Sequence, residues 1–100
     1  MDYDVITLVS QQYTKDKYLV QQTTPNKTNV YAKVESISQS EFFAAGNEGI
    51  KPAYKFSEVK ADEYHGEKEV EYKGVSYAVY RTYRTREDVL ELYVTQKVGV

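Results

Sequence analysis

The chain has 100 residues, no cysteine, one histidine and two prolines. Without cysteine it can form no disulfide framework, no thiolate metal site and no cysteine nucleophile. A single histidine excludes motifs such as H-E-x-x-H and leaves little with which to bind zinc. No apolar run approaches the roughly 20 residues needed to span a bilayer. We therefore expect no metal, no other cofactor and no contact with a membrane.

An excess of basic residues is also missing. Thirteen Lys and Arg stand against fifteen Asp and Glu, which gives a net charge of −2. A nearly neutral chain lacks the net basic surface of most nucleic-acid-binding proteins. The first residues, Met1-Asp2-Tyr3-Asp4, are acidic where a signal peptide is basic and then apolar. These features predict a soluble protein made in the cytoplasm.

Signatures of catalysis are absent from the sequence as well. No serine lies in a Gly-x-Ser-x-Gly setting, and no Gly-rich phosphate loop follows an expected strand. Glu67, Glu69 and Glu71 alternate at a spacing of about 7 Å on a strand, which could imitate a glycosidase carboxylate pair. Three like charges on one strand face are nevertheless more typical of a solvated surface. We predict that the protein is not an enzyme and has no catalytic residues.

What the chain has in quantity is tyrosine, with eleven residues, and an alternation of apolar and polar side chains that predicts β-strands. Residues 4–10 alternate, with Ile6 and Leu8 on one face. A second short strand is expected at Tyr18-Leu19-Val20, and the polar stretch from Gln21 to Asn29, which contains Pro25, is expected to be a loop. A third strand is expected over 29–38, with its inward face formed by Val30, Ala32 and Val34.

The periodicity then changes to that of a short helix. Ser38 followed by Glu41 matches a capping box, residues 42–45 can complete about two turns, and Gly46 is a plausible stop. Phe42 and Phe43 would point about 100° apart on this helix. Three arrangements are open: one ring seats on the body of the protein while the other faces elsewhere, both rings plug an open end, or one anchors a neighbouring subunit.

The second half of the chain returns to strands. A strand begins near Ile50, and Pro52 predicts that it lies at a sheet edge or frays at its start. Residues 62–66 are expected to form a turn. Lys73-Gly74 is a two-residue hairpin turn, whose register places Tyr72 opposite Val75 and brings their face into the core. A last strand is expected over 88–98, with its apolar face formed by Leu90, Leu92 and Val94.

Together these segments predict an all-β fold with a single domain over residues 1–100. Six or seven short strands would form a small antiparallel β-barrel, and the one short helix would lie in a long loop over residues 39–60. Closing the barrel would remove the exposed sheet edges that a small strand-rich domain otherwise has.

Charge is unevenly distributed along the second half. Residues 58–71 carry six acids and two lysines, net −4, whereas residues 72–86 carry four basic residues and no acid, net +4. As partners in a hairpin these segments can neutralise each other across strands. They can equally supply the two complementary patches that a ring-forming subunit needs. The alternation of basic and aromatic residues over 80–86 leaves a third interpretation open, a platform for single-stranded nucleic acid.

The order of these segments resembles a known family. Tyr31-Ala32-Lys33-Val34-Glu35-Ser36 leads to Ser40-Glu41-Phe42-Phe43-Ala44-Ala45, and then come Tyr64-His65-Gly66-Glu67, Val70-Glu71-Tyr72-Lys73-Gly74-Val75-Ser76-Tyr77 and Val79-Tyr80-Arg81-Thr82-Tyr83. Glu91-Leu92-Tyr93 and Lys97-Val98-Gly99 follow. This order resembles the small head–tail joining proteins of long-tailed bacteriophages, also called head-completion, head-closure or stopper proteins. The resemblance runs from about Asn29 to the C-terminus and rests on the order of strand and hairpin patterns.

The resemblance implies a structural protein of the virion neck. Subunits of this family form a homo-oligomeric ring, here expected to be sixfold or twelvefold, below the portal and adaptor proteins and above a tail-completion or tail protein. The ring closes the DNA channel after packaging, so packaged DNA is only its cargo. A long loop forms the gate in the lumen, and here it would contain Glu41, Phe42, Phe43, Asn47, Glu48, Lys51 and Lys55.

Contacts between subunits are expected from the acidic and basic segments, namely Asp62, Glu63, Glu67, Tyr80, Arg81, Tyr83, Arg84 and Arg86. Two other functions remain open. The chain could be another structural phage protein, for tail completion or in the baseplate. It could also be a small barrel of the oligonucleotide-binding type, with Arg81, Arg84 and Arg86 meeting phosphates.

Overall fold

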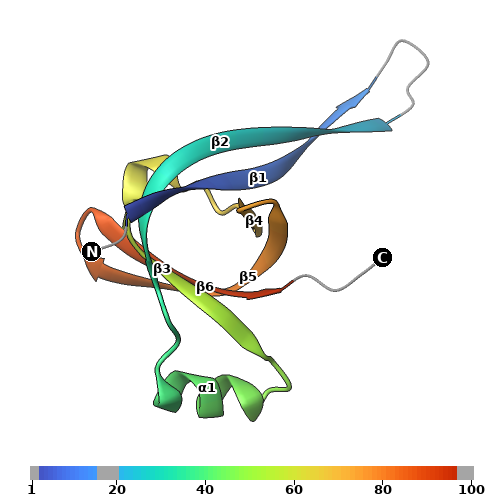
Figure 1. Ribbon diagram of the computed structural model, residues 1–100. Helices are drawn as coiled ribbons and strands as arrows, with labels where there is room; N and C mark the ends of the chain where they lie inside the picture. The colour runs from blue at the N-terminus through green and yellow to red at the C-terminus, as the bar shows by residue number, and fades with distance from the viewer. Residues whose placement is uncertain (1–2, 16–20, 97–100) are drawn as a thin grey trace.

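The computed structural model describes residues 3–15 and 21–96, which form a closed antiparallel barrel (Figure 1). Around the barrel the strand order is β1-β2-β3-β6-β5-β4. The described elements are β1 (Tyr3–Lys15), β2 (Gln21–Glu35), α1 (Gln39–Gly46), β3 (Pro52–Lys60), the 3-10 helix η1 (Ala61–Glu63), β4 (Glu69–Tyr72), β5 (Val75–Arg86) and β6 (Val89–Gln96). The prediction of a small all-β barrel with one short α-helix is confirmed.

The barrel interior is filled by alternating apolar side chains and by a group of aromatic rings. Phe56 is fully buried, and its ring centroid lies 5.5 Å from that of Tyr72, 6.0 Å from Tyr54 and 6.5 Å from Tyr77. Most of these contacts are edge-to-face, the arrangement that aromatic pairs prefer. Several of the chain's tyrosines therefore fill a core that has few large aliphatic residues. The expected inward positions are confirmed as buried for Ile6, Leu8, Val30, Ala32, Leu90, Leu92 and Val94.

The hairpin of β4 and β5 has the register expected from the sequence. Tyr72 pairs with Val75 and Val70 pairs with Tyr77. Lys73 and Gly74 both have positive φ, 51° and 79°. Two successive residues in this region are what a tight two-residue hairpin turn requires, because their twist matches that of the flanking strands.

The structure corrects the expected loop over residues 21–29. These residues form the first part of β2, which pairs with β1 continuously from Tyr3↔Lys33 to Lys15↔Gln21. Pro25 and the polar residues around it suggested a loop, but proline is tolerated in a strand whose other edge is unpaired. The short strand expected at residues 18–20 lies outside the described residues. Over the described residues, β1 and β2 pair with each other as one long two-stranded ribbon.

Much of this ribbon extends away from the barrel (Figure 1). Within the described residues, β1 pairs with β4 only over Thr7–Val9, and β2 pairs with β3 only over Lys33–Glu35. Beyond these pairs, residues 10–15 and 21–26 pair only with each other. We call this part of the ribbon the arm. It contributes to a molecule of 51 × 30 × 25 Å with a radius of gyration of 15.0 Å, larger than the roughly 13 Å of a compact chain of this length.

The structure also shortens the long loop expected over residues 39–60. Residues 52–60 are strand β3, which lies between β2 and β6, so the connection that carries α1 ends at Lys51. Phe56 and Val59 are fully buried, and burial of these side chains fixes the segment in the barrel wall. Pro52 pairs with Thr95 as the first residue of the strand. The strand begins two residues later than expected, and β3 is not an edge strand, since it lies between β2 and β6. At Pro52 itself only β6 is paired, because β2 pairs with β3 only over Lys55–Ser57.

Candidate interaction surfaces

The helix α1 begins and ends close to its predicted limits. The Ser38 hydroxyl oxygen accepts a hydrogen bond from the Glu41 amide at 3.2 Å, which caps the N-terminus. Gly46 is the last helical residue, and the amide of Asn47 donates to the Phe43 carbonyl at 3.1 Å. Within the helix Ala45 is the buried residue. Only a small part of α1 therefore contributes to packing, and most of its surface faces solvent.

Glu41 connects the helix to the barrel wall. The Tyr80 hydroxyl donates a hydrogen bond to Glu41 Oε2 at 2.9 Å, and Arg81 Nη2 lies 3.6 Å from the same oxygen. The Glu41 side chain is only 14% exposed. The sequence predicted a reciprocal capping box, but the carboxylate is directed to β5. This contact between α1 and β5 was not predicted, because nothing in the local sequence distinguishes the two roles of Glu41.

The same contact changes the acidity of nearby tyrosines. Burial, followed by the hydrogen bond to Glu41, raises the pKa of the Tyr80 hydroxyl well above its ordinary value. Burial and the hydrogen bond that the Tyr93 hydroxyl donates to Glu91 at 3.0 Å raise the pKa of Tyr93 to about 12. The two rings lie with centroids 6.3 Å apart. Both phenols thus stay protonated, as donors to carboxylates, at a higher pH than an ordinary tyrosine does.

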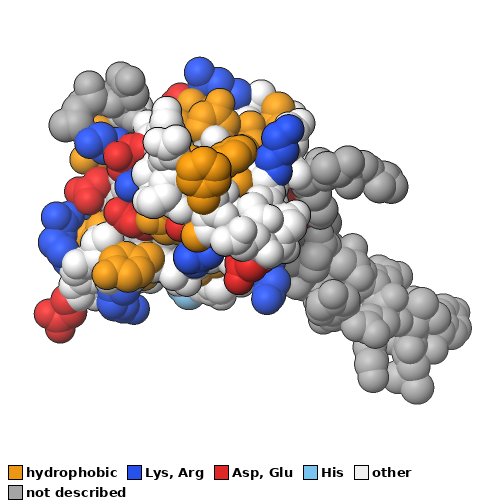
Figure 2. All heavy atoms as spheres, turned by 90° about the horizontal axis from the view of Figure 1, so that it is seen from below, with side chains coloured by type: hydrophobic (Ala, Val, Ile, Leu, Met, Phe, Trp, Pro, Cys, Tyr) orange, Lys and Arg blue, Asp and Glu red, His pale blue; other side chains and the backbone are white. Residues whose placement is uncertain are grey.

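Phe42 and Phe43 are exposed on α1, by 44% and 62%. Their rings lie edge to face with centroids 6.3 Å apart, and neither belongs to the barrel core. The interpretation that both rings plug an open end is therefore wrong, whereas the seating of one ring on the barrel and the anchoring of a neighbouring subunit stay predictions. We call these two residues the Phe pair. Figure 2 views the molecule from the side on which α1 lies in Figure 1 and shows hydrophobic side chains exposed among charged ones.

A second exposed apolar surface lies on the outer face of the β1–β2 ribbon. Tyr31 is 72% exposed, and Val5, its cross-strand partner, is 42% exposed. Tyr3, two residues before Val5, is 54% exposed. We call these three residues the ribbon patch. Sequence reasoning did not single them out, although the alternation that buries Ile6 already places Tyr3 and Val5 on the opposite face.

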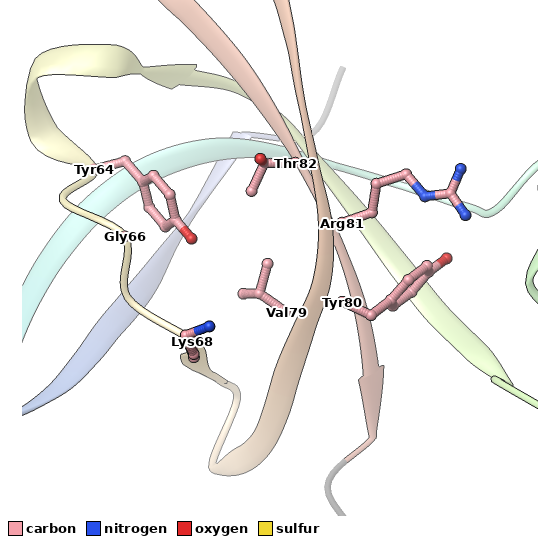
Figure 3. Close-up of a pocket in the computed structure, with 7 residues that line it drawn as sticks. All are labelled: Tyr64, Gly66, Lys68, Val79, Tyr80, Arg81 and Thr82. Carbon is pink, nitrogen blue, oxygen red and sulfur yellow. The ribbon is translucent and has the colours of Figure 1, made fainter.

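A shallow hollow of about 300 Å³ lies between the segment 64–68 and strand β5 (Figure 3). Tyr64 faces Val79 and Thr82 of β5 across it, whereas the side chains of Tyr80 and Arg81 extend on the other side of β5. The Tyr64 hydroxyl donates to the Glu67 carbonyl at 2.6 Å and so fixes one wall. The hollow is open to solvent. Among the described residues, no group of three or more His, Asp or Glu side chains could hold a metal ion there or elsewhere.

The charged segments do not neutralise each other across the β4–β5 hairpin as expected. The arginine-bearing half of β5 pairs with β6 and not with β4. Arg81 lies near two carboxylates of the α1 region, Glu41 and, at 3.8 Å, Glu48. Arg86 Nη2 donates to Glu58 at 3.0 Å, and Glu71 pairs with Lys27 at 3.1 Å. The Arg86–Glu58 pair joins the acidic to the basic segment, but it lies between β5 and β3 and not across the hairpin.

The residues expected at subunit contacts therefore have different surroundings. Asp62, Tyr83 and Arg84 are exposed, and the Arg84 guanidinium donates to the Glu87 carbonyl. Glu63 is partly buried in η1. Glu67 is only 8% exposed, and its Oε1 accepts from the His65 amide at 2.7 Å, so it shapes its own loop and does not offer a surface contact.

The residues expected in the gating loop are also divided. Asn47, Glu48 and Lys51 are exposed in the connection after α1. Lys55 instead lies on β3, where its ammonium is 3.9 Å from Glu35 and 3.8 Å from Glu91. Lys55 is therefore part of an ion-pair group on the barrel wall, and its place in the loop is corrected. The structure brings together Glu41, Tyr80, Arg81 and Glu48, which the sequence had assigned to two separate sites.

In comparisons with known proteins, no family model and no curated protein matches this chain. Across residues 3–15 and 21–96 no helix combines the length and apolar character that crossing a membrane demands. The function of the chain must therefore be argued from its own surfaces.

Proposed function

We propose that this protein is a structural subunit of a bacteriophage neck, a head–tail joining protein that assembles as a ring between the portal and adaptor and the tail. The observation that carries the proposal is a helix-bearing connection between β2 and β3 that is fixed to the barrel and presents two exposed phenylalanines. Such a connection has the position and the surface expected of an assembly element. The choice of the phage neck as the assembly rests on the resemblance in the order of the sequence segments.

The distribution of contacts favours this proposal over a chemical function. Glu41, the one acid of α1, contacts Tyr80 and Arg81, and so it holds the helix in place. The large apolar side chains that α1 leaves exposed are both aromatic, which is the residue type enriched at protein interfaces. A barrel that displays a fixed helix with two exposed phenylalanines is suited to binding another protein.

The connection also suits a channel through which DNA passes. Between Ser36 and Lys51 it carries two acids, Glu41 and Glu48, and one base, Lys51. A loop without excess positive charge does not retain the phosphate backbone by counterion release. A gate of this kind would let DNA leave without being bound.

The test is reconstitution with the products of the neighbouring genes. The chain would be mixed with the candidate portal–adaptor complex and followed by native mass spectrometry and negative-stain microscopy. We expect a ring of this chain on the complex. If the chain forms no ring and binds no neck component, the proposal is overturned. Gene position separates the neck from tail-completion or baseplate roles, because a gene for a neck protein should directly follow the portal, capsid and adaptor genes.

A second candidate is binding of single-stranded nucleic acid along β5, favoured by the exposed Tyr83 and Arg84. Two of the three arginines on this strand already face carboxylates, since Arg81 lies beside Glu41 and Arg86 beside Glu58. A filter-binding assay separates the candidates. Binding that weakens steeply with salt and with R81A, R84A and R86A would favour nucleic acid, and negligible binding at low salt would remove it.

A further inference from the structure

Two apolar surfaces of this chain have no function within the barrel itself. The Phe pair on α1 and the ribbon patch on β1–β2 expose five large side chains, whereas the same kinds of residue elsewhere fill the core. Clusters of exposed apolar side chains typically mark an interaction site. The two surfaces come from different elements, with α1 below the barrel and the β1–β2 ribbon along its upper side (Figure 1).

We propose that the Phe pair of one copy packs on the ribbon patch of a second copy, in a head-to-tail contact. This inference rests on the proposed function, since it names the surfaces through which the ring subunits would meet. The contact covers both exposed surfaces at once. Phe42 and Phe43 would lie against Tyr31, Val5 and Tyr3, which are flat or branched side chains on a pleated face.

A second copy fits these surfaces better than a unique partner does. A heterologous contact that closes a ring requires two different and complementary patches on every subunit. Here one patch is a projecting pair of rings and the other is a broad strand face. The charges beside them are also complementary: Glu48 follows α1 and stays 63% exposed although it lies 3.8 Å from Arg81, and Lys33 lies directly opposite Tyr3 in the ribbon. A symmetric contact between two Phe pairs would leave the ribbon patch uncovered.

The contact should be weak between free subunits. Five side chains make a smaller interface than the roughly 800 Å² per partner of stable complexes. In a ring assembled on a template, each subunit makes two such contacts, and the effective concentration of neighbours rises. The test must therefore capture a transient contact.

Cross-linking between single cysteines provides this test, because the chain has no cysteine of its own. One chain would carry Q39C, one helical turn before the Phe pair, and a longer tagged chain would carry N29C, two residues before Tyr31 on β2; both positions are exposed, and all five contact side chains are kept. The two are mixed with a short bis-maleimide, at high concentration and again with the neck components. The matched control replaces N29C with E87C, an exposed position on the turn between β5 and β6. We expect Q39C–N29C to cross-link at least about tenfold faster than Q39C–E87C, in line with a raised effective concentration.

Added to Q39C, the substitutions F42S and F43S should reduce this rate severalfold, while far-UV circular dichroism confirms that the strands remain. Equal rates for N29C and E87C, both with and without neck components, would overturn the inference. Faster Q39C–Q39C linkage would overturn it in favour of a symmetric helix contact. Selective Q39C–N29C linkage without binding to neck components would leave the contact standing and remove the proposed neck function. Binding to neck components without selective linkage would leave the neck function standing and remove the contact.

Discussion

Replacing Glu41 with glutamine should weaken the attachment of α1 to the barrel. The Glu41 carboxylate accepts a hydrogen bond from the Tyr80 hydroxyl at 2.9 Å and is only 14% exposed. A hydrogen bond to a charged group contributes about 1.5–3 kcal/mol, whereas one between neutral groups contributes about 0.5–1.5 kcal/mol. The partly exposed Arg81, 3.6 Å away, adds at most about 1 kcal/mol. Because Gln has nearly the same shape, E41Q should lower the free energy of unfolding by about 1–2 kcal/mol.

Urea denaturation followed by tyrosine fluorescence measures this loss. With a slope of about 2 kcal/mol/M, the middle of the range for small proteins in urea, the midpoint should fall by roughly 0.5–1 M. The control is E48Q, because Glu48 is 63% exposed and lies 3.8 Å from Arg81. An exposed pair of this kind should change stability by less than about 0.5 kcal/mol.

A double-mutant cycle with Y80F identifies the partner. Phenylalanine keeps the ring of residue 80 and removes the hydroxyl donor, so E41Q and Y80F together should cost less than the sum of the two, by about 1 kcal/mol. E41Q should also lower the pKa of Tyr80, since Glu41 contributes to raising it. The reasoning is refuted if E41Q and E48Q are equally stable, or if E41Q and Y80F are additive.

Three further results are expected. F56A should lower the free energy of unfolding by about 3–5 kcal/mol in urea, because the ring is fully buried among three others, and a loss below about 1 kcal/mol would contradict this. G74A should lower the free energy of unfolding by about 1–2 kcal/mol, because residue 74 has a φ of +79° that alanine disfavours. G46A, at the end of α1, should leave the stability unchanged or raise it. Thermal melting in which G46A is less stable than G74A would disprove this. The pKa values of Tyr80 and Tyr93 are raised, so above pH 10 the folded state keeps protons that the unfolded state releases. The stabilising contribution of these two hydroxyls is therefore complete below pH 10 and is lost as the pH rises towards 12. A free energy of unfolding that increases from about pH 9.5 to 11.5 would be inconsistent with this.

Local patterns predicted the parts of the fold that local physics determines. Lys73-Gly74 fixed the β4–β5 hairpin because its turn conformation and the alternation beside it require the same register. Ser38 correctly marked the start of α1 because its hydroxyl caps a nearby amide. Burial of Leu90, Leu92 and Val94 followed from alternation alone.

Contacts distant in sequence were not predictable in the same way. Arg81 was expected to face acids across the β4–β5 hairpin, but β5 is longer than β4, and its second half continues beside β6. There Arg81 meets Glu41, forty residues earlier in the chain. The arm was misread for a related reason. The polar, proline-containing residues 21–29 of β2 have the composition of a loop, and only their pairing with β1 shows that they form a strand.

The way in which the ribbon joins the barrel has a mechanical consequence. Two seams hold it, each of three residue pairs, Thr7–Val9 with β4 and Lys33–Glu35 with β3, whereas β5 and β6 share eight. The arm of six residues extends about 20 Å beyond these seams. A force applied to the end of the arm therefore acts mainly on the two shortest strand pairings of the barrel. Although the barrel is closed, such a force should separate β1 from β4 and β2 from β3 first, while the β3-β6-β5-β4 sheet stays intact.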